Sequence, residues 1–191
     1  MKMGEQIFDE KRTKTVTITL TQSCNLSCKY CYEEHKRSRS MDFDCAFGII
    51  SKELSKTDDY EFVVLDLFGG EPFLQFNLIK KLVASVRAKE WEHDYHFSVS
   101  TNGTLVHGEI QGWLIEQCDC FSCALSYDGT DIMQNINRDN SADIIDLDFF
   151  LNQYGGEEIK MTVSPETLPM LSEGVMYLQK MGFEVINCNS Y

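Results

Sequence analysis

Three cysteines within eight residues are the side chains of this sequence best suited to hold a metal cluster. Cys24, Cys28 and Cys31 follow the β-rich run from Thr15 to Leu20, so we expect them in a loop at the carboxyl end of a strand. A cubane iron–sulfur cluster is normally held by four cysteine thiolates. Three thiolates would leave one iron without a protein ligand, and an open coordination position is typical of catalytic rather than structural metal sites. The loop therefore predicts a [4Fe–4S] cluster with a non-protein ligand.

Other uses of the cysteines remain open at this point. A structural zinc site needs four ligands, and the fourth could come from Cys45 or from the Cys-x-Cys-x2-Cys segment at 118–123. A disulfide framework fits poorly, because no secretion signal precedes the cysteines. Free cysteine behaves mostly as a small buried hydrophobic residue. We interpret the remaining five in that way: Cys45, Cys118, Cys120, Cys123 and Cys188.

The cysteine loop resembles the hallmark of the radical S-adenosylmethionine (radical SAM) enzymes. That hallmark is Cys-x3-Cys-x2-Cys with an aromatic residue before the last cysteine, which here is Tyr30. The resemblance implies that the open iron chelates S-adenosylmethionine. It further implies that an electron from the reduced cluster cleaves the sulfonium, and that the resulting 5′-deoxyadenosyl radical abstracts hydrogen from a substrate. Tyr30 is then expected to touch the adenine.

Strand-like and helix-like segments alternate along the chain, which predicts parallel βα units. We expect strands over 15–20, 61–68, 95–100, 122–126, 159–163 and 183–186. Helices are expected over 42–56, capped by Asp42, over 76–89 and 107–117, and from Ser164-Pro165-Glu166 to about 181, with a polar loop-and-helix region over 130–154. The expected fold is α/β, a partial (β/α)6 barrel of the radical SAM core.

Residues 1–191 are expected to form one radical SAM core domain that ends at or just after strand six, without an auxiliary-cluster domain. Either the chain is a piece of a longer polypeptide or it is a reduced member of the family, and an end on a strand favours the first. Strand six would then lie at an open edge, with Phe183, Val185 and Ile186 partly exposed. We expect such a chain to be marginally stable or to self-associate.

Ligand sites of parallel α/β folds gather at the carboxyl ends of strands. Gly69-Gly70-Glu71-Pro72 follows the second expected strand. Two glycines let backbone come close to a ligand, although alone the segment would also suit a tight turn. The resemblance implies that Gly69, Gly70 and Glu71 contact the methionyl amino group of the cofactor.

Three further segments end expected strands. Thr101-Asn102-Gly103 resembles a segment that lines the cofactor pocket, which implies a contact from Asn102, although Asn-Gly is also a common turn. Ser126-Tyr127-Asp128-Gly129 and the later Arg138 resemble positions that offer a serine and an arginine to the cofactor's carboxylate and ribose, since an arginine fork suits a carboxylate. For Arg138 a surface salt bridge is the alternative.

Met161 to Pro165 resembles a strand end near the adenine. Asp66 interrupts an apolar strand, either as an inward polar residue or as a hydrogen-bonded core carboxylate.

The combined motifs look most like the SPASM-type maturases, similar to sulfatase-maturing enzymes, which modify peptides or protein side chains. The resemblance implies a peptide or protein substrate and an external reductant such as flavodoxin or ferredoxin, and it assigns no catalytic residue in this chain. The formal net charge of −13 argues against a nucleic-acid partner, and no apolar stretch has the length of a membrane span. We expect a cytoplasmic protein. The competing hypothesis is a non-catalytic zinc- or iron–sulfur-binding regulatory module.

Overall fold

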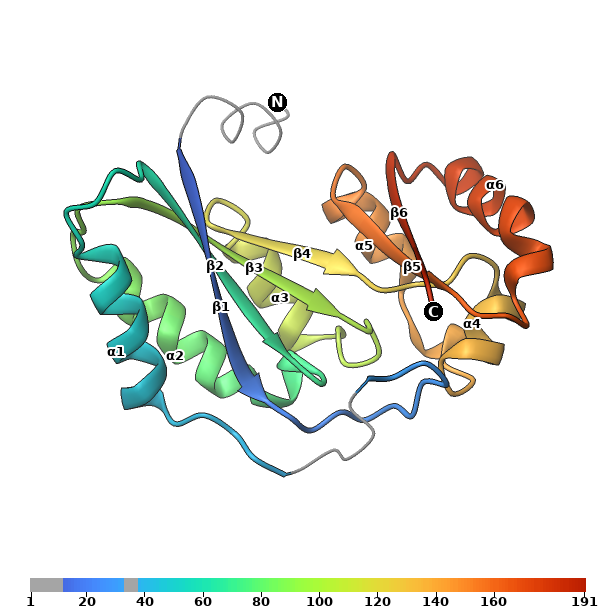
Figure 1. The fold of residues 1–191 in the computed structure, drawn as a ribbon, viewed down its shortest axis with the longest axis horizontal. Helices are drawn as coiled ribbons and strands as arrows, with labels where there is room; N and C mark the ends of the chain where they lie inside the picture. The colour runs from blue at the N-terminus through green and yellow to red at the C-terminus, as the bar shows by residue number, and fades with distance from the viewer. Residues whose placement is uncertain (1–11, 33–37) are drawn as a thin grey trace.

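The computed structural model describes residues 12–32 and 38–191, and it alternates strands with helices as the sequence predicts (Figure 1). The strands are β1 (Thr13–Thr21), β2 (Phe62–Gly69), β3 (Asp94–Thr101), β4 (Phe121–Leu125), β5 (Glu158–Val163) and β6 (Val185–Ser190). The α-helices are α1 (Phe43–Leu54), α2 (Phe76–Arg87), α3 (Glu109–Glu116), α4 (Asp131–Asn137), α5 (Leu147–Tyr154) and α6 (Leu171–Met181). Short 3-10 helices are η1 (Pro72–Gln75), η2 (Ala142–Ile144) and η3 (Leu168–Met170).

The strands form two parallel sheets, and within each sheet they follow the order of the chain. Strands β1 to β4 form one sheet, and β5 pairs with β6 in the other. A single bridge between Ser126 and Lys160 joins them, supported by a 3.0 Å hydrogen bond from the Tyr127 amide to the Lys160 carbonyl. Figure 1 shows α1 and α2 beside the larger sheet and α4 to α6 around the smaller one. This is the expected partial barrel, with an unpredicted break after β4.

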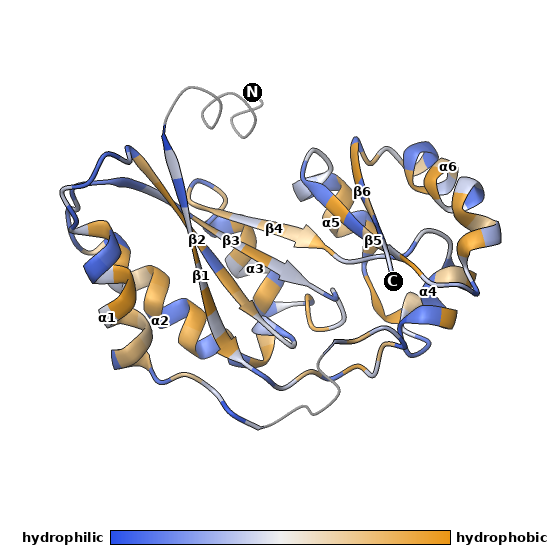
Figure 2. Cartoon of the chain, viewed as in Figure 1, coloured by the Kyte–Doolittle hydropathy of each residue, from blue (hydrophilic) through white to orange (hydrophobic). Residues whose placement is uncertain are grey.

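Alternation along the strands gives the sheets one apolar face and one polar face. In β2, Leu65 and Leu67 are fully buried in the core that the helices cover, and Asp66 between them lies on the opposite face. Figure 2 shows hydrophobic residues along β4 and on the helices, interspersed with hydrophilic ones. We call the face that carries Asp66 the inner face. There the Asp66 carboxylate accepts hydrogen bonds from Thr17 at 3.1 Å and Ser98 at 3.2 Å, so Asp66 is an inward polar residue.

The expected helix start at Ser164-Pro165-Glu166 is wrong. Ser164 and Thr167 form a turn in which each side-chain oxygen accepts a hydrogen bond from the other residue's backbone amide, and α6 begins only at Leu171. Such local bonds compete with helix formation. In addition, Pro169 lacks the N–H that a helix begun at Pro165 would need at that position.

The end of the chain is more buried than expected at one residue. Phe183 is 4% exposed and packs in the core, because Gly182 takes the left-handed conformation (φ +110°) and turns the chain inward after α6. Val185 is exposed and Ile186 is half-buried, as predicted, and β6 pairs only with β5 among the described residues. The predicted cap of α1 is confirmed: the Asp42 carboxylate accepts a hydrogen bond from the Cys45 amide at 2.9 Å.

The five isolated cysteines divide into two groups. Cys120 and Cys123 are buried, as predicted. The interpretation of Cys45, Cys118 and Cys188 as buried residues is wrong, because all three are exposed. Cys45 lies on α1, Cys118 just after α3 and Cys188 on the edge strand β6. Within the described ranges, no helix is both long and apolar enough to cross a membrane.

Candidate functional site

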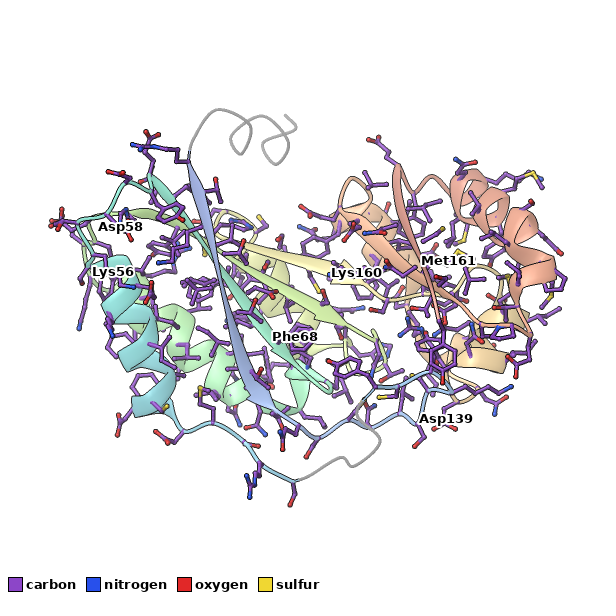
Figure 3. The ribbon with its side chains drawn as sticks, viewed as in Figure 1. Lys56, Asp58, Phe68, Asp139, Lys160 and Met161 are labelled. Atoms are coloured by element: carbon purple, nitrogen blue, oxygen red, sulfur yellow. The ribbon has the colours of Figure 1, made fainter. Side chains whose placement is uncertain are left out.

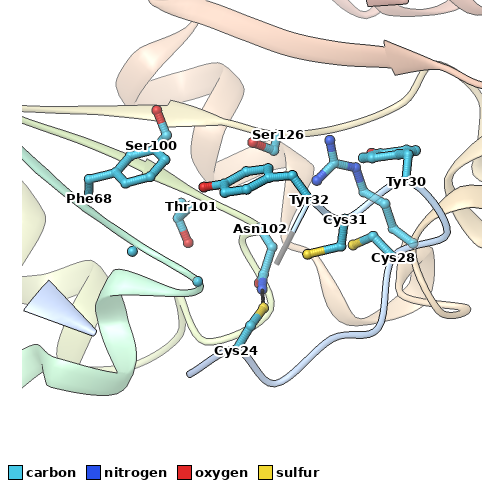
Figure 4. A pocket seen from close by; sticks show the side chains of 13 residues that line it. Cys24, Cys28, Tyr30, Cys31, Tyr32, Phe68, Ser100, Thr101, Asn102 and Ser126 are labelled. Atoms are coloured by element: carbon cyan, nitrogen blue, oxygen red, sulfur yellow. Dashed lines mark hydrogen bonds between the residues drawn. The ribbon is translucent and has the colours of Figure 1, made fainter. Parts of the chain in front are cut away.

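A pocket opens at the carboxyl ends of the first four strands, where the cysteine loop crosses them (Figure 4). Its cavity volume is about 180 Å³, and it is open to solvent. Its lining consists of Cys24, Cys28, Tyr30, Cys31, Tyr32, Phe68, Gly69, Gly70, Ser100, Thr101, Asn102, Ser126 and Arg138. The three cysteines of the motif therefore share one cavity with residues from three strand ends.

Two glycines allow the cysteine loop to pack directly on the end of β2. The Gly70 amide donates to the Thr21 carbonyl at 3.0 Å, and the Glu71 amide donates to the Ser23 carbonyl at 2.9 Å. A Cβ atom at Gly70 would lie 2.4 Å from the Ser23 carbonyl oxygen and 3.0 Å from the Cβ of Cys24. At Gly69 it would lie 2.5 Å from the Thr21 carbonyl oxygen. No side chain fits at either position while the loop stays in place.

Glu71 holds two of these strand ends together from within the protein. Its side chain is fully buried and accepts hydrogen bonds from the Thr101 hydroxyl and the Asn102 amide at 2.8 Å, and from the Phe73 amide at 3.1 Å. Burial raises the pKa of Glu71, although these three donors oppose the shift. The carboxylate does not line the pocket. The predicted contact between Glu71 and a cofactor could therefore be made only by the backbone of Glu71.

The sulfur of Cys24 receives two N–H groups. The Leu26 amide lies 3.4 Å from Sγ, and Nδ2 of Asn102 lies 3.8 Å away, as the dashed line in Figure 4 marks. The side-chain amide of Asn102 also donates to the side-chain oxygen of Asn25 at 3.0 Å. The side-chain oxygen of Asn102 accepts from the Thr104 hydroxyl at 2.7 Å. Hydrogen bonds to cysteine sulfur stabilise its anionic form and tune the potential of a cluster bound to it.

A buried carboxylate ties the other end of the cysteine loop to β5. Asp128 is fully buried and accepts hydrogen bonds from the Tyr30 hydroxyl, from Arg138 at 3.0 Å and from the Thr162 amide at 2.8 Å. The Arg138 guanidinium lies 5.3 Å from the centre of the Tyr30 ring and is 7% exposed. Burial, partly opposed by Arg138, raises the pKa of Tyr30 well above its usual range. Arg138 thus reaches the pocket, but with its charge already paired.

The donor set fits a cluster with three protein ligands. Cys24, Cys28 and Cys31 are half-buried, and burial raises the pKa of Cys28 while the nearby Arg138 cation lowers it. Within residues 12–32 and 38–191, no three His, Cys, Asp or Glu side chains converge as they would on a single ion. Cluster ligands need not converge in that way, because each cysteine binds a different iron corner. The arrangement suits a cubane cluster better than a four-ligand zinc site.

The structure brings together most of the residues predicted from the sequence. Tyr30, Gly69, Gly70, Asn102, Ser126 and Arg138 line the pocket with the three cysteines, whereas the side chain of Glu71 does not. No role was expected for Asp128 or Asn25, and the inner-face residues Phe68 and Ser100 were not expected to line the pocket. Asp128 had a signal, since an acidic residue directly after an apolar strand needs a buried partner.

The comparisons with known proteins agree with this site. The model of a family described as "4Fe-4S single cluster domain" matches residues 13–143. The chain is 29% identical over 180 residues to an uncharacterized protein of Methanocaldococcus jannaschii, which covers 91% of this chain and 61% of the relative. It is 25% identical over 130 residues to the radical SAM cyclopropyl synthase TigE of Paramaledivibacter caminithermalis, covering 60% of this chain and 26% of TigE. It is 24% identical over 183 residues to GTP 3′,8-cyclase of Stenotrophomonas maltophilia, covering 91% and 44%.

Solved structures share the fold. The chain superposes on anSMEcpe with bound AdoMet and the Kp18Cys peptide at a TM-score of 0.79 and 21% identity, covering 93% of this chain and 51% of that one. For Streptococcus suis SuiB bound to its precursor peptide SuiA, the TM-score is 0.65 at 15% identity, covering 93% and 39%. The chain thus spans less than two thirds of the length of each of these proteins.

Replacing Gly70 by Ala is expected to abolish cluster binding. The new Cβ would collide with the Ser23 carbonyl and push Cys24 away from its place in the pocket. We expect the iron and acid-labile sulfide per chain, measured after anaerobic reconstitution, to fall to a small fraction of the wild-type content. Gly48→Ala on α1 is the matched control, because its Cβ would meet no atom within 4 Å. Full iron content in Gly70→Ala would contradict the packing argument.

Replacing Asp128 by Ala is expected to lower the free energy of unfolding by about 3–5 kcal/mol, because it leaves the buried Arg138 cation without a partner. Tyr30→Phe removes one hydrogen bond to the same carboxylate and is expected to cost about 1 kcal/mol. Urea unfolding of the protein measures both. Asp143→Ala, at an exposed position, should stay within about 0.5 kcal/mol of wild type. Equal effects of Asp128→Ala and Asp143→Ala would show that the pair is unimportant.

Proposed function

The chain belongs to the 4Fe–4S single cluster domain family within the radical SAM superfamily, and on this premise we propose that it is the core of a radical SAM enzyme that modifies a peptide or a protein side chain. The observation that carries the proposal is the loop with Cys24, Cys28 and Cys31, whose sulfurs line a pocket made of strand ends. When bound, a reduced [4Fe–4S] cluster supplies the electron that cleaves S-adenosylmethionine to methionine and a 5′-deoxyadenosyl radical able to abstract hydrogen.

The residues of the pocket divide the work of binding the cluster and the cofactor. Cys24, Cys28 and Cys31 would hold three irons, and the N–H groups of Leu26 and Asn102 would stabilise the sulfur of Cys24. Because the two glycines expose backbone at the end of β2, the Gly69 and Gly70 carbonyls are suited to accept from the methionyl ammonium.

The opposite wall of the pocket would hold the remaining polar groups of the cofactor. We assign the carboxylate and ribose to Arg138 and Ser126, and the adenine to Tyr30. The salt bridge between Arg138 and Asp128 fixes the guanidinium before the cofactor binds, so that less side-chain entropy is lost on binding. These assignments follow from the resemblance to the family, and they are supported by the presence of all three side chains in the pocket lining. No catalytic acid or base is assigned within the chain.

A peptide substrate is supported by the likeness to two structures that were solved with peptides, anSMEcpe and SuiB. Radical cleavage needs one electron for each turnover, so the proposal includes an external reductant such as flavodoxin or ferredoxin. An oxygen-sensitive cluster and eight cysteines are best kept in a reducing compartment, and we therefore propose a cytoplasmic location. The 191 residues would form the core domain of the enzyme.

We expect anaerobically reconstituted and dithionite-reduced protein to convert S-adenosylmethionine to methionine and 5′-deoxyadenosine. Cys28→Ala should abolish this conversion because it removes a cluster ligand, whereas Cys45→Ala is the matched control, since Cys45 is exposed on α1. Chromatography of the nucleoside product measures the activity, and iron and zinc analysis of the same samples identifies the bound metal.

Two results would contradict the proposal. One is cleavage by Cys28→Ala at the wild-type rate. The other is a tightly held zinc with no uptake of iron, which would favour the non-catalytic module instead.

A further inference from the structure

The inner face of the sheets continues from the pocket toward β5, and one lysine lies at their junction. The bridge between Ser126 and Lys160 places Lys160 at the level of the pocket-lining end of β4. Its ammonium donates to the Ser100 hydroxyl at 2.7 Å, and Ser100 also lines the pocket. Figure 3 labels Lys160 at this junction and Phe68, another lining residue, near the end of β2. A substrate that enters the pocket along the inner face would reach Lys160.

We propose that Lys160 binds a carboxylate of the substrate, so that the substrate is a peptide with an acidic side chain next to the residue that is modified. This inference rests on the proposed function and deepens it by naming a substrate class. It is a specificity-determining contact rather than a catalytic one, because Lys160 would bind a part of the substrate that does not react.

The ammonium of Lys160 has donors left for a ligand. Three N–H groups are available on a lysine, and the hydrogen bond to Ser100 uses one of them. In the described part of the chain, the carboxylate that pairs with Lys160 is that of Glu158, 3.9 Å away, and Glu158 accepts a shorter hydrogen bond from Asn187 at 2.6 Å. The Lys160 side chain is 41% exposed, so a ligand can reach it.

The second cation at this pocket is in a different state. Arg138 is 7% exposed and contacts the Asp128 carboxylate at 3.0 Å through two of its nitrogens, so its charge is compensated inside the protein. Lys29 forms a 3.8 Å ion pair with Glu166 on the surface, whereas Lys160 hydrogen-bonds to Ser100, which lines the pocket. Among the residues described, Lys160 is therefore the cation that is tied to the pocket lining and is also exposed enough to take a ligand.

The surrounding charges favour one carboxylate over a polyphosphate. On the same inner face, Glu158 lies two residues before Lys160, and Asp66 lies farther down, at the level of Ser98 and Ser122. Opposite charges in contact attract each other at a protein surface, although water and salt weaken the attraction. A single carboxylate gains that attraction from Lys160 alone. A triphosphate would bring several more negative charges toward the two acidic residues, with no further cation on these strands to offset them.

The test measures binding of two N-acetylated and C-amidated tripeptides, alanine–glutamate–alanine and alanine–glutamine–alanine, to the cluster- and S-adenosylmethionine-loaded protein by saturation-transfer NMR. We expect wild type to bind the glutamate peptide about tenfold more tightly, as a hydrogen-bonded charge pair implies. Lys160→Gln should equalise the two peptides, and Lys160→Arg should keep most of the preference. Lys52→Gln, an exposed lysine on α1, is the control that should leave the preference unchanged.

Four results would overturn this role of Lys160. The first is equal binding of both peptides by wild type, and the second is a glutamate preference that survives in Lys160→Gln. The third is a loss of S-adenosylmethionine affinity in Lys160→Gln, which would place Lys160 in the cofactor site. GTP that competes with the peptide only when Lys160 is present would also overturn it, in favour of a nucleotide substrate.

The proposed function fails separately from this inference. Absence of reductive cleavage in wild type would overturn the proposed function without changing the peptide preference, which is read from binding. Loss of the preference with cleavage intact would overturn only the role of Lys160.

Discussion

The close packing of the cysteine loop on the end of β2 is the constraint on which the rest of the site depends. Backbone meets backbone there, since the amides of Gly70 and Glu71 donate to the carbonyls of Thr21 and Ser23. This contact is possible only without side chains at the two glycines. It places Cys24 directly after the contact, and it leaves both glycines in the lining of the pocket. Chain geometry thus places the first cluster ligand before any metal is bound.

Two buried carboxylates then hold the pocket walls in place, each by a different means. Glu71 joins the ends of β2 and β3 through three neutral donors and pairs with no cation. Asp128 joins the cysteine loop, the end of α4 and β5, and its charge is met by Arg138. Because a buried charge is costly without partners, both carboxylates resist movement of the groups that bind them. The result is a pocket that is largely formed in advance, a condition that favours both tight binding and control of a reactive species.

Local patterns made most of this site predictable. The spacing of Cys24, Cys28 and Cys31 is a property of eight consecutive residues, and the strand that precedes them places the loop at one end of the sheet. The glycine pair and Ser126 also follow strands directly, so their place at the same edge follows from parallel topology. The cap of α1 and four of the six strand starts, to within one residue, needed no more than periodicity and turn chemistry.

The features that could not be predicted depend on partners distant in sequence. That Glu71 turns inward follows from donors 30 and 31 residues away, and the pairing of Asp128 with Tyr30 spans 98 residues. The late start of α6 comes from local competition for backbone hydrogen bonds, which periodicity does not register. Periodicity also does not register the break between β4 and β5. Cys45 and Cys188 are exposed although cysteine is usually buried. On an outer helix or an edge strand, the residue type alone does not predict burial.

The most direct test of the account is whether the fourth iron binds the cofactor itself. The measurement is electron–nuclear double resonance on the reduced cluster in the presence of S-adenosylmethionine labelled with nitrogen-15 at its amino group. In the wild-type protein we expect a nitrogen-15 hyperfine coupling strong enough to require a direct bond between that nitrogen and iron. A reduced cluster with S-adenosylmethionine bound nearby, but with no nitrogen-15 coupling, would contradict the open coordination position from which the proposed function is derived.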